Sequence, residues 1–255
     1  MSTATYQDSL ACGLQPQPST ADAGALTRRE RKTQAARAAH VRKIKQLIMG
    51  SAFIVFLAAG WFYPLIGYFI PLCMLLGIGI AAFQGRSWCN WLCPRGSFAD
   101  SLLSRVSRHG RIPQALRSTP MRLGVMGLLM TVLTVQLIRL WPDPWAIGGF
   151  FVILLTITTG AGVILGVIFQ QRSWCYLCPI GTMSNWVGQN RQPLHLEQSQ
   201  CRDCGLCAKK CPMQLAPVGL REPGGMNQRG DCLKCSVCVD NCPTAALSWT
   251  TAAGK

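Results

Sequence analysis

The chain has 255 residues, of which 49% are hydrophobic, and a formal net charge of +15. That length allows one medium domain or two small ones. The positive charge could indicate nucleic-acid binding, since clustered Lys and Arg neutralise phosphates. Here, however, the basic residues crowd the flanks of apolar runs, as expected of membrane segments that face the cytoplasm. We therefore expect membrane lipid as a partner and no nucleic acid.

The first segment, residues 1–45, is polar and basic, and we expect it to be a disordered basic tail. Residues 1 to about 27 are rich in Ser, Thr, Ala, Gln and Pro, a composition typical of disorder. The stretch from Arg28 to Lys45 carries eight Lys and Arg against the single Glu30, and we expect it to be a helical arm close to the membrane. The apolar run that follows is too long for the core of a signal peptide, so no cleavable signal is predicted.

Two apolar blocks are long enough to cross a membrane. Residues 46–85 contain no Asp, Glu, Lys, Arg or His, and residues 123–171 contain only two charges. Because one span needs about 20 apolar residues, each block predicts two helices, divided near residues 61–64 and at a proline turn near 140–145. The expected membrane domain, 46–188, therefore has four transmembrane helices arranged as two tandem hairpins, at about 46–62, 65–83, 123–140 and 146–169.

The distribution of basic residues predicts the orientation of these hairpins. Of 25 Lys and Arg, eight lie in the arm, seven between residues 84 and 122, and nine after residue 169, whereas the two short turns have none. Basic loops stay on the cytoplasmic side of a membrane. We therefore expect a multi-pass protein of the bacterial inner membrane with both termini in the cytoplasm.

A sequence repeat ends each hairpin. Residues 83–97 read FQGRSWCNWLCPRGS, and residues 169–182 read FQQRSWCYLCPIGT, which is one residue shorter. Each hairpin therefore delivers one Cys-Pro motif to the same membrane face. The four cysteines of these motifs are Cys89, Cys93, Cys175 and Cys178.

Three interpretations of these four thiols stay open. They could be reactive redox thiols of the CxxC kind, although no βαβ pattern surrounds them, or small buried residues near helix ends. The interpretation that we favour is one metal or cluster site formed by four thiols from two equivalent hairpins. Nearby Arg86, Arg95 and Arg172 would then lower the pKa of the thiols and offset the charge of a cluster.

The last part, 189–255, is polar and rich in cysteine, and it contains two copies of one motif. Each copy reads Cys-x2-Cys-x2-Cys-x3-Cys-Pro, the bacterial ferredoxin run, in which the fourth cysteine binds the other cluster. We expect one [4Fe–4S] cluster on Cys201, Cys204, Cys207 and Cys242, and a second on Cys232, Cys235, Cys238 and Cys211. Zinc is the alternative, but zinc sites combine Cys pairs far apart in sequence, often with His, and no His lies within these motifs. The spacing therefore predicts a small α+β domain of the two-cluster ferredoxin type that conducts electrons.

Two hairpins that each end in a Cys-Pro motif, followed by a two-cluster ferredoxin segment, resemble the ferredoxin-type membrane proteins of the NapH and MauN kind. The resemblance covers about Lys43 to Trp249. It implies four spans, cytoplasmic clusters, and electrons drawn from the quinone pool towards a partner redox protein. In two respects the chain departs from the family: Cys175 and Cys178 are separated by two residues where the family has three, and the outward loops are short.

Two classes of function follow from the resemblance. In the first, the chain is the electron-transfer component of a quinol dehydrogenase-type complex, such as one that serves a periplasmic nitrate reductase. Its substrate is then quinol, and its partner is another redox protein or ferredoxin-type subunit. In the second, it is an assembly or maturation factor that reduces a metal centre, because similar halves occur in NosR-like and CcoG-like proteins. No motif for nucleotide-driven or hydrolytic chemistry is present.

Overall fold

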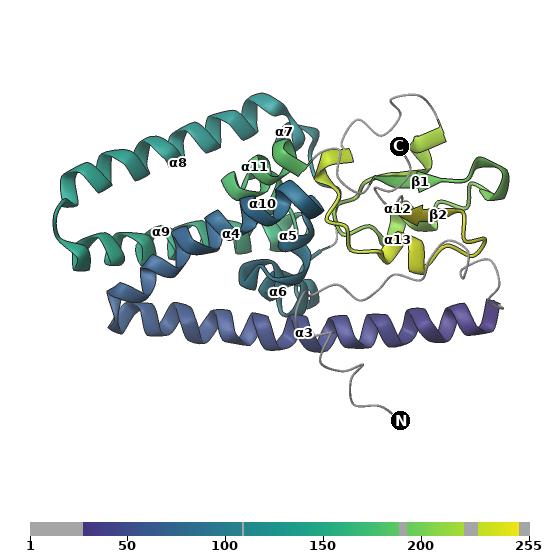
Figure 1. The fold of residues 1–255 in the computed structure, drawn as a ribbon, viewed down its shortest axis with the longest axis horizontal. Helices are drawn as coiled ribbons and strands as arrows, with labels where there is room; N and C mark the ends of the chain where they lie inside the picture. Colours follow the sequence, from purple (N-terminus) through teal and green to yellow (C-terminus); the bar gives the residue numbers. More distant parts are fainter. Residues whose placement is uncertain (1–27, 109, 189–192, 222–228, 250–255) are drawn as a thin grey trace.

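A computed structural model describes residues 28–108, 110–188, 193–221 and 229–249 (Figure 1). The expectation of disorder for residues 1–27 lies outside this range. Long helices form one end of the molecule, and a small domain with two short strands forms the other (Figure 1). The short helices that carry the Cys-Pro motifs lie between the two parts, so both meet at the repeat.

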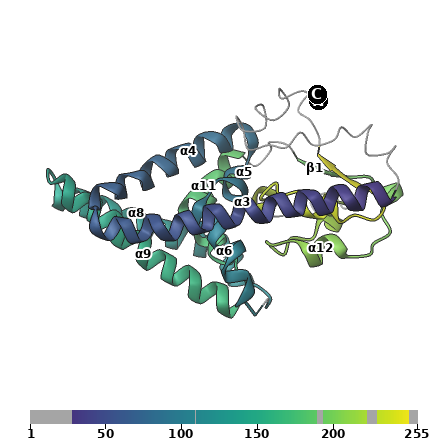
Figure 2. The ribbon, with the colours of Figure 1, turned by 90° about the horizontal axis from the view of Figure 1, so that it is seen from below.

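The basic arm and the first span form one continuous helix, α3 (Arg28–Phe62). Residues 28–45, expected to form a helical arm, are helical in the structure, so the disordered tail expected over residues 1–45 does not extend into them. The reason is local: this stretch has no proline and is rich in Ala, Arg and Lys, which are good helix formers. Figure 2 shows the N-terminal part of α3 lying beside the ferredoxin domain. There Arg42 pairs with Asp240 at 3.4 Å, and its guanidinium lies 5.6 Å from the centre of the Trp91 ring.

Four helical segments are long and apolar enough to cross a membrane, as the two hairpins require. They are Thr33–Phe62, Pro64–Gln84, Thr119–Leu140 and Pro144–Ile168. The first lies within α3, the second combines the 3-10 helix η1 (Pro64–Tyr68) with α4 (Phe69–Gln84), and the others are α8 (Thr119–Leu140) and α9 (Pro144–Ile168). The four spans expected from the sequence are confirmed.

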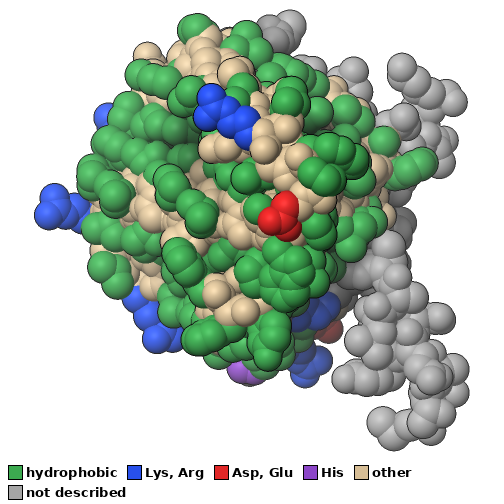
Figure 3. Space-filling model, turned by 90° about the vertical axis from the view of Figure 1, so that its left-hand side faces the viewer, with side chains coloured by type: hydrophobic (Ala, Val, Ile, Leu, Met, Phe, Trp, Pro, Cys, Tyr) green, Lys and Arg blue, Asp and Glu red, His purple; other side chains and the backbone are tan. Residues whose placement is uncertain are grey.

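The surfaces of these helices fit a lipid environment. Large apolar side chains point outward on all four, with Val55 68%, Leu75 71%, Leu128 64% and Ile157 65% exposed. Figure 3 looks onto the end of the bundle that carries the two short turns, and hydrophobic side chains dominate that face, with few charges. A water-soluble domain would bury such side chains, so the bundle is built to face lipid.

Each hairpin continues into a similar set of short helices. The first leads into α5 (Ser87–Trp91), α6 (Pro94–Ser101) and the 3-10 helix η2 (Leu103–Arg105), and the second leads into α10 (Trp174–Leu177) and α11 (Pro179–Gly188). Helix α5 has five residues and α10 has four, so the missing residue of the second motif shortens this helix. Helix α6 packs on α3, α11 packs on α4, and α7 (Gln114–Arg117) precedes α8.

The ferredoxin domain is held together by one antiparallel strand pair and two similar loops. Strand β1 (Leu194–Leu196) pairs with β2 (Leu247–Trp249), with Leu194 opposite Trp249. Between them lie η3 (Gln198–Gln200), α12 (Leu206–Lys210), η4 (Pro217–Arg221), η5 (Arg229–Asp231) and α13 (Val237–Asp240). Positive φ angles fall at equivalent places of the two cysteine motifs, in the pairs Asp203 and Lys234, Gly205 and Ser236, and Gln214 and Ala245. The two motifs therefore wind in the same way, as an internal repeat predicts.

Candidate functional site

The eight cysteines of the ferredoxin domain line two small cavities. One cavity of about 20 Å³ is lined by Cys201, Cys204, Cys207 and Cys242, here called the Cys204 set. Another of about 20 Å³ is lined by Cys211, Cys232, Cys235 and Cys238, here called the Cys235 set. The fourth cysteine of each motif thus lies with the first three of the other motif. This grouping is the one that the crossed ferredoxin spacing predicts, and cluster ligation by these residues stays a prediction.

The chemistry of both sets fits an iron–sulfur cluster. Each set offers four thiols, and its lining residues include no His, Asp or Glu except Asp203 in the Cys204 set. Within the described ranges, no three Cys, His, Asp or Glu side chains meet closely enough to hold one metal ion. The four thiols of each set therefore lie around a cavity and do not converge on a single ion position. Burial raises the pKa of Cys235 to about 12, so a bound cluster, which requires thiolates, would displace protons there.

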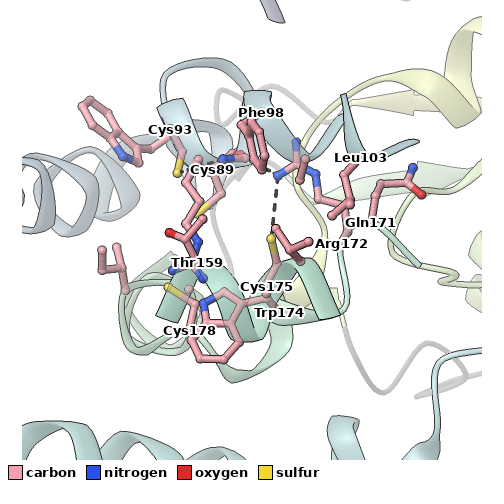
Figure 4. Close-up of a pocket in the computed structure, with 18 of the residues that line it drawn as sticks. Cys89, Cys93, Phe98, Leu103, Thr159, Gln171, Arg172, Trp174, Cys175 and Cys178 are labelled. Atoms are coloured by element: carbon pink, nitrogen blue, oxygen red, sulfur yellow. Dashed lines mark hydrogen bonds between the residues drawn. The ribbon is translucent and has the colours of Figure 1, made fainter. Parts of the chain in front are cut away.

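The four cysteines of the Cys-Pro motifs line a third and larger cavity, of about 70 Å³. Figure 4 shows Cys89 and Cys93 facing Cys175 and Cys178 across this space. It lies where α5 and α10 meet, and we call it the membrane-edge pocket. Cys93 also caps α6, because its sulfur accepts a hydrogen bond from the backbone N–H of Gly96 at 3.4 Å. The structure thus brings all four thiols together, and metal binding by them stays a prediction.

Two arginines at equivalent positions of the repeat brace this pocket. The guanidinium of Arg86 donates to the carbonyl oxygen of Cys175 at 2.9 Å, and that of Arg172 donates to the carbonyl oxygen of Cys89, also at 2.9 Å. Each arginine therefore reaches across to the cysteine of the other repeat. Arg172 also lies 3.8 Å from the sulfur of Cys175 (Figure 4).

Two glycines leave room for these arginines. A Cβ added at Gly96 would lie 2.7 Å from a guanidinium nitrogen of Arg172, and one added at Gly181 would lie 2.7 Å from that of Arg86. Both distances are too short for a carbon atom. The glycine of each Cys-Pro-x-Gly segment is thus required by the arginine of the opposite repeat.

The two arginines bind different carboxylates, and this breaks the symmetry. Arg172 is held by Asp100 of α6 at 2.8 Å, within the membrane-domain side of the molecule. Arg86 is held at 2.9 Å by Asp231, the residue before Cys232 in the ferredoxin domain. Asp231 is 1% exposed and also accepts from Arg122 at 2.9 and 2.7 Å and from Asn185 at 3.0 Å. A buried carboxylate of the ferredoxin domain therefore ties that domain to the pocket.

A second link runs through Tyr176, between the two cysteines of the second motif. Its hydroxyl donates to the carbonyl oxygen of Met213 at 2.6 Å. The guanidinium groups of Arg117 and Arg122 lie 5.3 and 5.0 Å from the centre of its ring. Met213 follows Cys211 and Pro212, so this link also ends beside the Cys235 set.

Several buried polar atoms at the membrane-edge pocket lack a partner in the described structure. They are Arg86 Nε, Thr159 Oγ1, Gln171 Oε1 and Trp174 Nε1, and all four residues line the pocket. Buried polar groups without a partner are uncommon. Three of these atoms carry a hydrogen to donate, which suits a sulfur-rich anionic group held by four thiolates.

The expected lowering of a thiol pKa by the arginines is present at Cys89, where Arg86 and Arg172 both lower the pKa, but burial has the larger effect and the pKa is raised. Burial disfavours the thiolate and also raises the pKa of Cys93 to about 12. Arg95 serves the pocket in another way, because its guanidinium lies 4.7 Å from the centre of the Trp174 ring and donates to the carbonyl oxygen of Thr158.

Comparisons with known proteins agree with this arrangement. A family model described as a 4Fe-4S binding domain matches residues 66–113 and 144–195, which contain the two Cys-Pro motifs, and one described as a 4Fe-4S dicluster domain matches residues 200–247. The ferredoxin-type protein MauN of Methylobacillus flagellatus, named for methylamine utilization, is 32% identical over 189 residues, which cover 68% of this chain and 65% of MauN. The ferredoxin-type protein NapH of Haemophilus influenzae is 25% identical over 189 residues, covering 67% of this chain and 64% of NapH. The chain is thus similar to the ferredoxin-type proteins MauN and NapH over about two thirds of its length.

The two family models identify iron–sulfur binding domains in this chain, and its four apolar helices are long enough to cross a membrane. The protein NirI of Paracoccus denitrificans is also similar, 27% identical over 221 residues, covering 68% of this chain and 28% of NirI. The chain therefore spans just under two thirds of NapH and MauN and little more than a quarter of NirI. No solved structure matches it.

Sequence reasoning missed the residues that connect the two domains. Arg122 and Tyr176 give no signal of their own in the sequence, because their partners lie far away: Arg122 and Asp231 are 109 residues apart, and Tyr176 and Met213 are 37 apart. Asp231 offered one signal, because it is an acidic residue directly before a cysteine motif in a basic chain.

Proposed function

We propose that this chain passes electrons from membrane quinol to a partner redox protein. The observation that carries the proposal is the row of three four-cysteine pockets. One lies at the membrane edge, where the two hairpins end, and it is joined by Arg86 and Tyr176 to a domain that holds the other two. An iron–sulfur cluster supplies one-electron transfer without a change in bonding.

The chemistry balances with a quinol donor. A quinol that is oxidised to quinone releases two electrons and two protons, and each cluster accepts one electron at a time. The protein must therefore accept the two electrons in succession while the protons leave to water. The membrane-edge pocket is also lined by Thr159, Gly162 and Val163 of the apolar helix α9, so a quinol among the helices would find its nearest acceptor there. In this proposal, Cys89, Cys93, Cys175 and Cys178 hold a third iron–sulfur site.

The orientation belongs to the same proposal. The ferredoxin domain lies at the end of the molecule where the basic arm of α3 begins, the short helices of the Cys-Pro motifs lie in the middle, and the two short turns lie at the other end (Figure 1). Under the positive-inside rule, the clusters and both termini are cytoplasmic. The terminal acceptor is then a cytoplasmic-facing redox protein or ferredoxin-type subunit.

The test is anaerobic reduction of the full chain in lipid nanodiscs by menaquinol or ubiquinol, followed by EPR. We expect the ferredoxin signals to be reduced by at least one of the two quinols. In the Cys89→Ser/Cys175→Ser variant we expect iron per protein to fall and quinol-dependent reduction to be lost, while dithionite still reduces the ferredoxin domain. Unchanged iron together with an unchanged rate would mean that these four cysteines only pack.

A second outcome would favour the maturation role. If neither quinol reduces the protein but the dithionite-reduced protein reduces a copper or iron centre of another protein, the chain donates electrons during assembly of that centre. In that case neither the parent nor the Cys89→Ser/Cys175→Ser variant is reduced by quinol, so the two proteins do not differ in quinol-dependent reduction.

A further inference from the structure

We infer that the two cysteine sets of the ferredoxin domain have different places: the Cys235 set faces the membrane-edge pocket, and the Cys204 set faces the redox partner. The inference deepens the proposed function and rests on it. The spacing of the two motifs is the same, so the sequence treats the sets as equal. The surroundings of the two sets in the structure differ.

Side chains of the Cys235 set share one apolar core with the membrane-edge pocket. Cys89, Tyr176, Met213, Leu233 and Cys235 belong to a single buried cluster, and Cys175, Cys211 and Cys232 pack against it. A continuous packed path of this kind keeps two redox centres at a short and fixed separation, and it excludes water between them. A second core contains Leu194, Leu196, Leu247 and Cys238, and Cys201, Cys207 and Cys242 pack against it. The Cys235 set therefore contributes to both cores, whereas three cysteines of the Cys204 set pack on the second.

Two polar links from the pocket region to the ferredoxin domain end beside the Cys235 set. Arg86 bonds the carbonyl oxygen of Cys175 at one side and Asp231, the neighbour of Cys232, at the other. Tyr176 bonds Met213, two residues after Cys211. These links hold the chain beside Cys232 and beside Cys211, so they fix the Cys235 set against the membrane domain.

The Cys204 set is open to solvent at the opposite side. Cys204 is the one cysteine among those in the described ranges that is exposed, whereas Cys235 and Cys238 are buried. Next to it Leu206 is 38% exposed, and Arg202, Lys209 and Lys210 are exposed too. An exposed apolar side chain with exposed basic residues near it in the chain, beside a redox centre, suits brief docking of a protein that accepts one electron. In that exchange one electron leaves the cluster on the Cys204 set and reduces the partner, and no bond is made or broken.

The experiment compares the solvent access of the two sets in the full chain. The protein in nanodiscs is reduced with dithionite, the reductant is removed, and EPR power saturation is measured with and without the dysprosium–EDTA complex, a paramagnetic relaxation agent that stays in water. Relaxation of a cluster signal by this complex depends on how close the complex approaches. We expect a clear effect on the signal that disappears in Cys204→Ala, and a several-fold smaller effect on the signal that disappears in Cys235→Ala.

Electron exchange gives a second measurement. After dithionite reduction, hexacyanoferrate(III) is added and the bleaching and recovery of iron–sulfur absorbance are followed by stopped flow. In Cys204→Ala, which keeps the Cys235 set, we expect oxidation to be at least several-fold slower than in Cys235→Ala, which keeps the exposed set. Equal rates, or a stronger dysprosium effect on the Cys235 signal, would overturn the assignment. Because dithionite supplies the electrons, a failure of quinol oxidation does not affect either measurement.

Discussion

Arg86 donates a hydrogen bond to the carbonyl oxygen of Cys175, 89 residues further along the chain, at 2.9 Å. The equivalent arginine of the second repeat, Arg172, returns the contact to Cys89. This exchange explains why both repeats retain Arg-Ser-Trp-Cys. Each arginine fixes the backbone of the opposite cysteine, so the pocket forms only when both hairpins are folded and packed.

The first prediction concerns the glycine that makes room for this exchange. In Gly96→Ala the new Cβ would lie 2.7 Å from Arg172 and 2.8 Å from the carbonyl oxygen of Cys89. Because neither neighbour is free to move, we expect the free energy of unfolding to fall by about 1–3 kcal/mol, with less iron bound at the membrane-edge pocket. The measurement is thermal unfolding in detergent together with iron per protein.

The matched control for that prediction is Gly127→Ala in α8, where nothing lies within 4 Å of the added Cβ. Alanine favours a helix over glycine by roughly 1 kcal/mol, so this variant should be as stable as the parent or more so. If Gly96→Ala behaved like Gly127→Ala, the close approach of Arg172 would not be present in solution.

The second prediction separates the two arginines. Arg86→Met removes one of the partners of buried Asp231, and loss of one member of a buried pair typically costs about 3–5 kcal/mol. We expect Arg86→Met to loosen the ferredoxin domain from the membrane domain, which hydrogen exchange of residues 229–238 would report as faster exchange. Arg172→Met removes a similar contact to a cysteine carbonyl but leaves Asp231 untouched, so it should destabilise the pocket without that change. The same exchange rates in both variants would contradict the role given to Asp231.

The third prediction concerns cluster ligation. If the crossed sets bind clusters, the ferredoxin domain alone contributes about eight irons, four for each cubane. Cys211→Ala should then damage the cluster held by Cys232, Cys235 and Cys238, and spare the one held by the first motif. Iron analysis and EPR of reduced protein provide the check. Selective loss of the cluster on Cys201, Cys204 and Cys207 would show that ligation is not crossed.

The fourth prediction concerns topology, for which the charge distribution is the reason. Reporter fusions at Gly110 and Lys255 should report the cytoplasm, and insertions near Tyr63 or Asp143 should report the outer side. A control fusion within α8, at Val132, should give an intermediate signal. A C-terminus on the outer side would place both ferredoxin sets in the wrong compartment for the proposed acceptor.

The sequence by itself determined the features that depend on neighbouring residues. Uncharged runs such as 46–85 determined the spans, because membrane insertion depends on the length and polarity of a continuous segment. The spacing of Cys201 to Cys211 and of Cys232 to Cys242 determined the cluster type, because three closely spaced thiols must bind the same group. The repeat around Cys89 and Cys175 predicted that four thiols meet, and the structure brings them together in one cavity.

Only the tertiary structure decided how these parts are connected. The partners Arg86 and Asp231 are separated by 145 residues, and no local pattern specifies such a pair. The same holds for the balance of pKa effects at Cys89, where burial raises the pKa more than Arg86 and Arg172 lower it, because the whole fold contributes to the desolvation. The difference between the Cys235 and Cys204 sets is also tertiary, since identical spacing gives identical local windings. The two sets differ because the Cys235 set packs against Tyr176 and the membrane-edge pocket, and this contact forms only when the two folded parts dock.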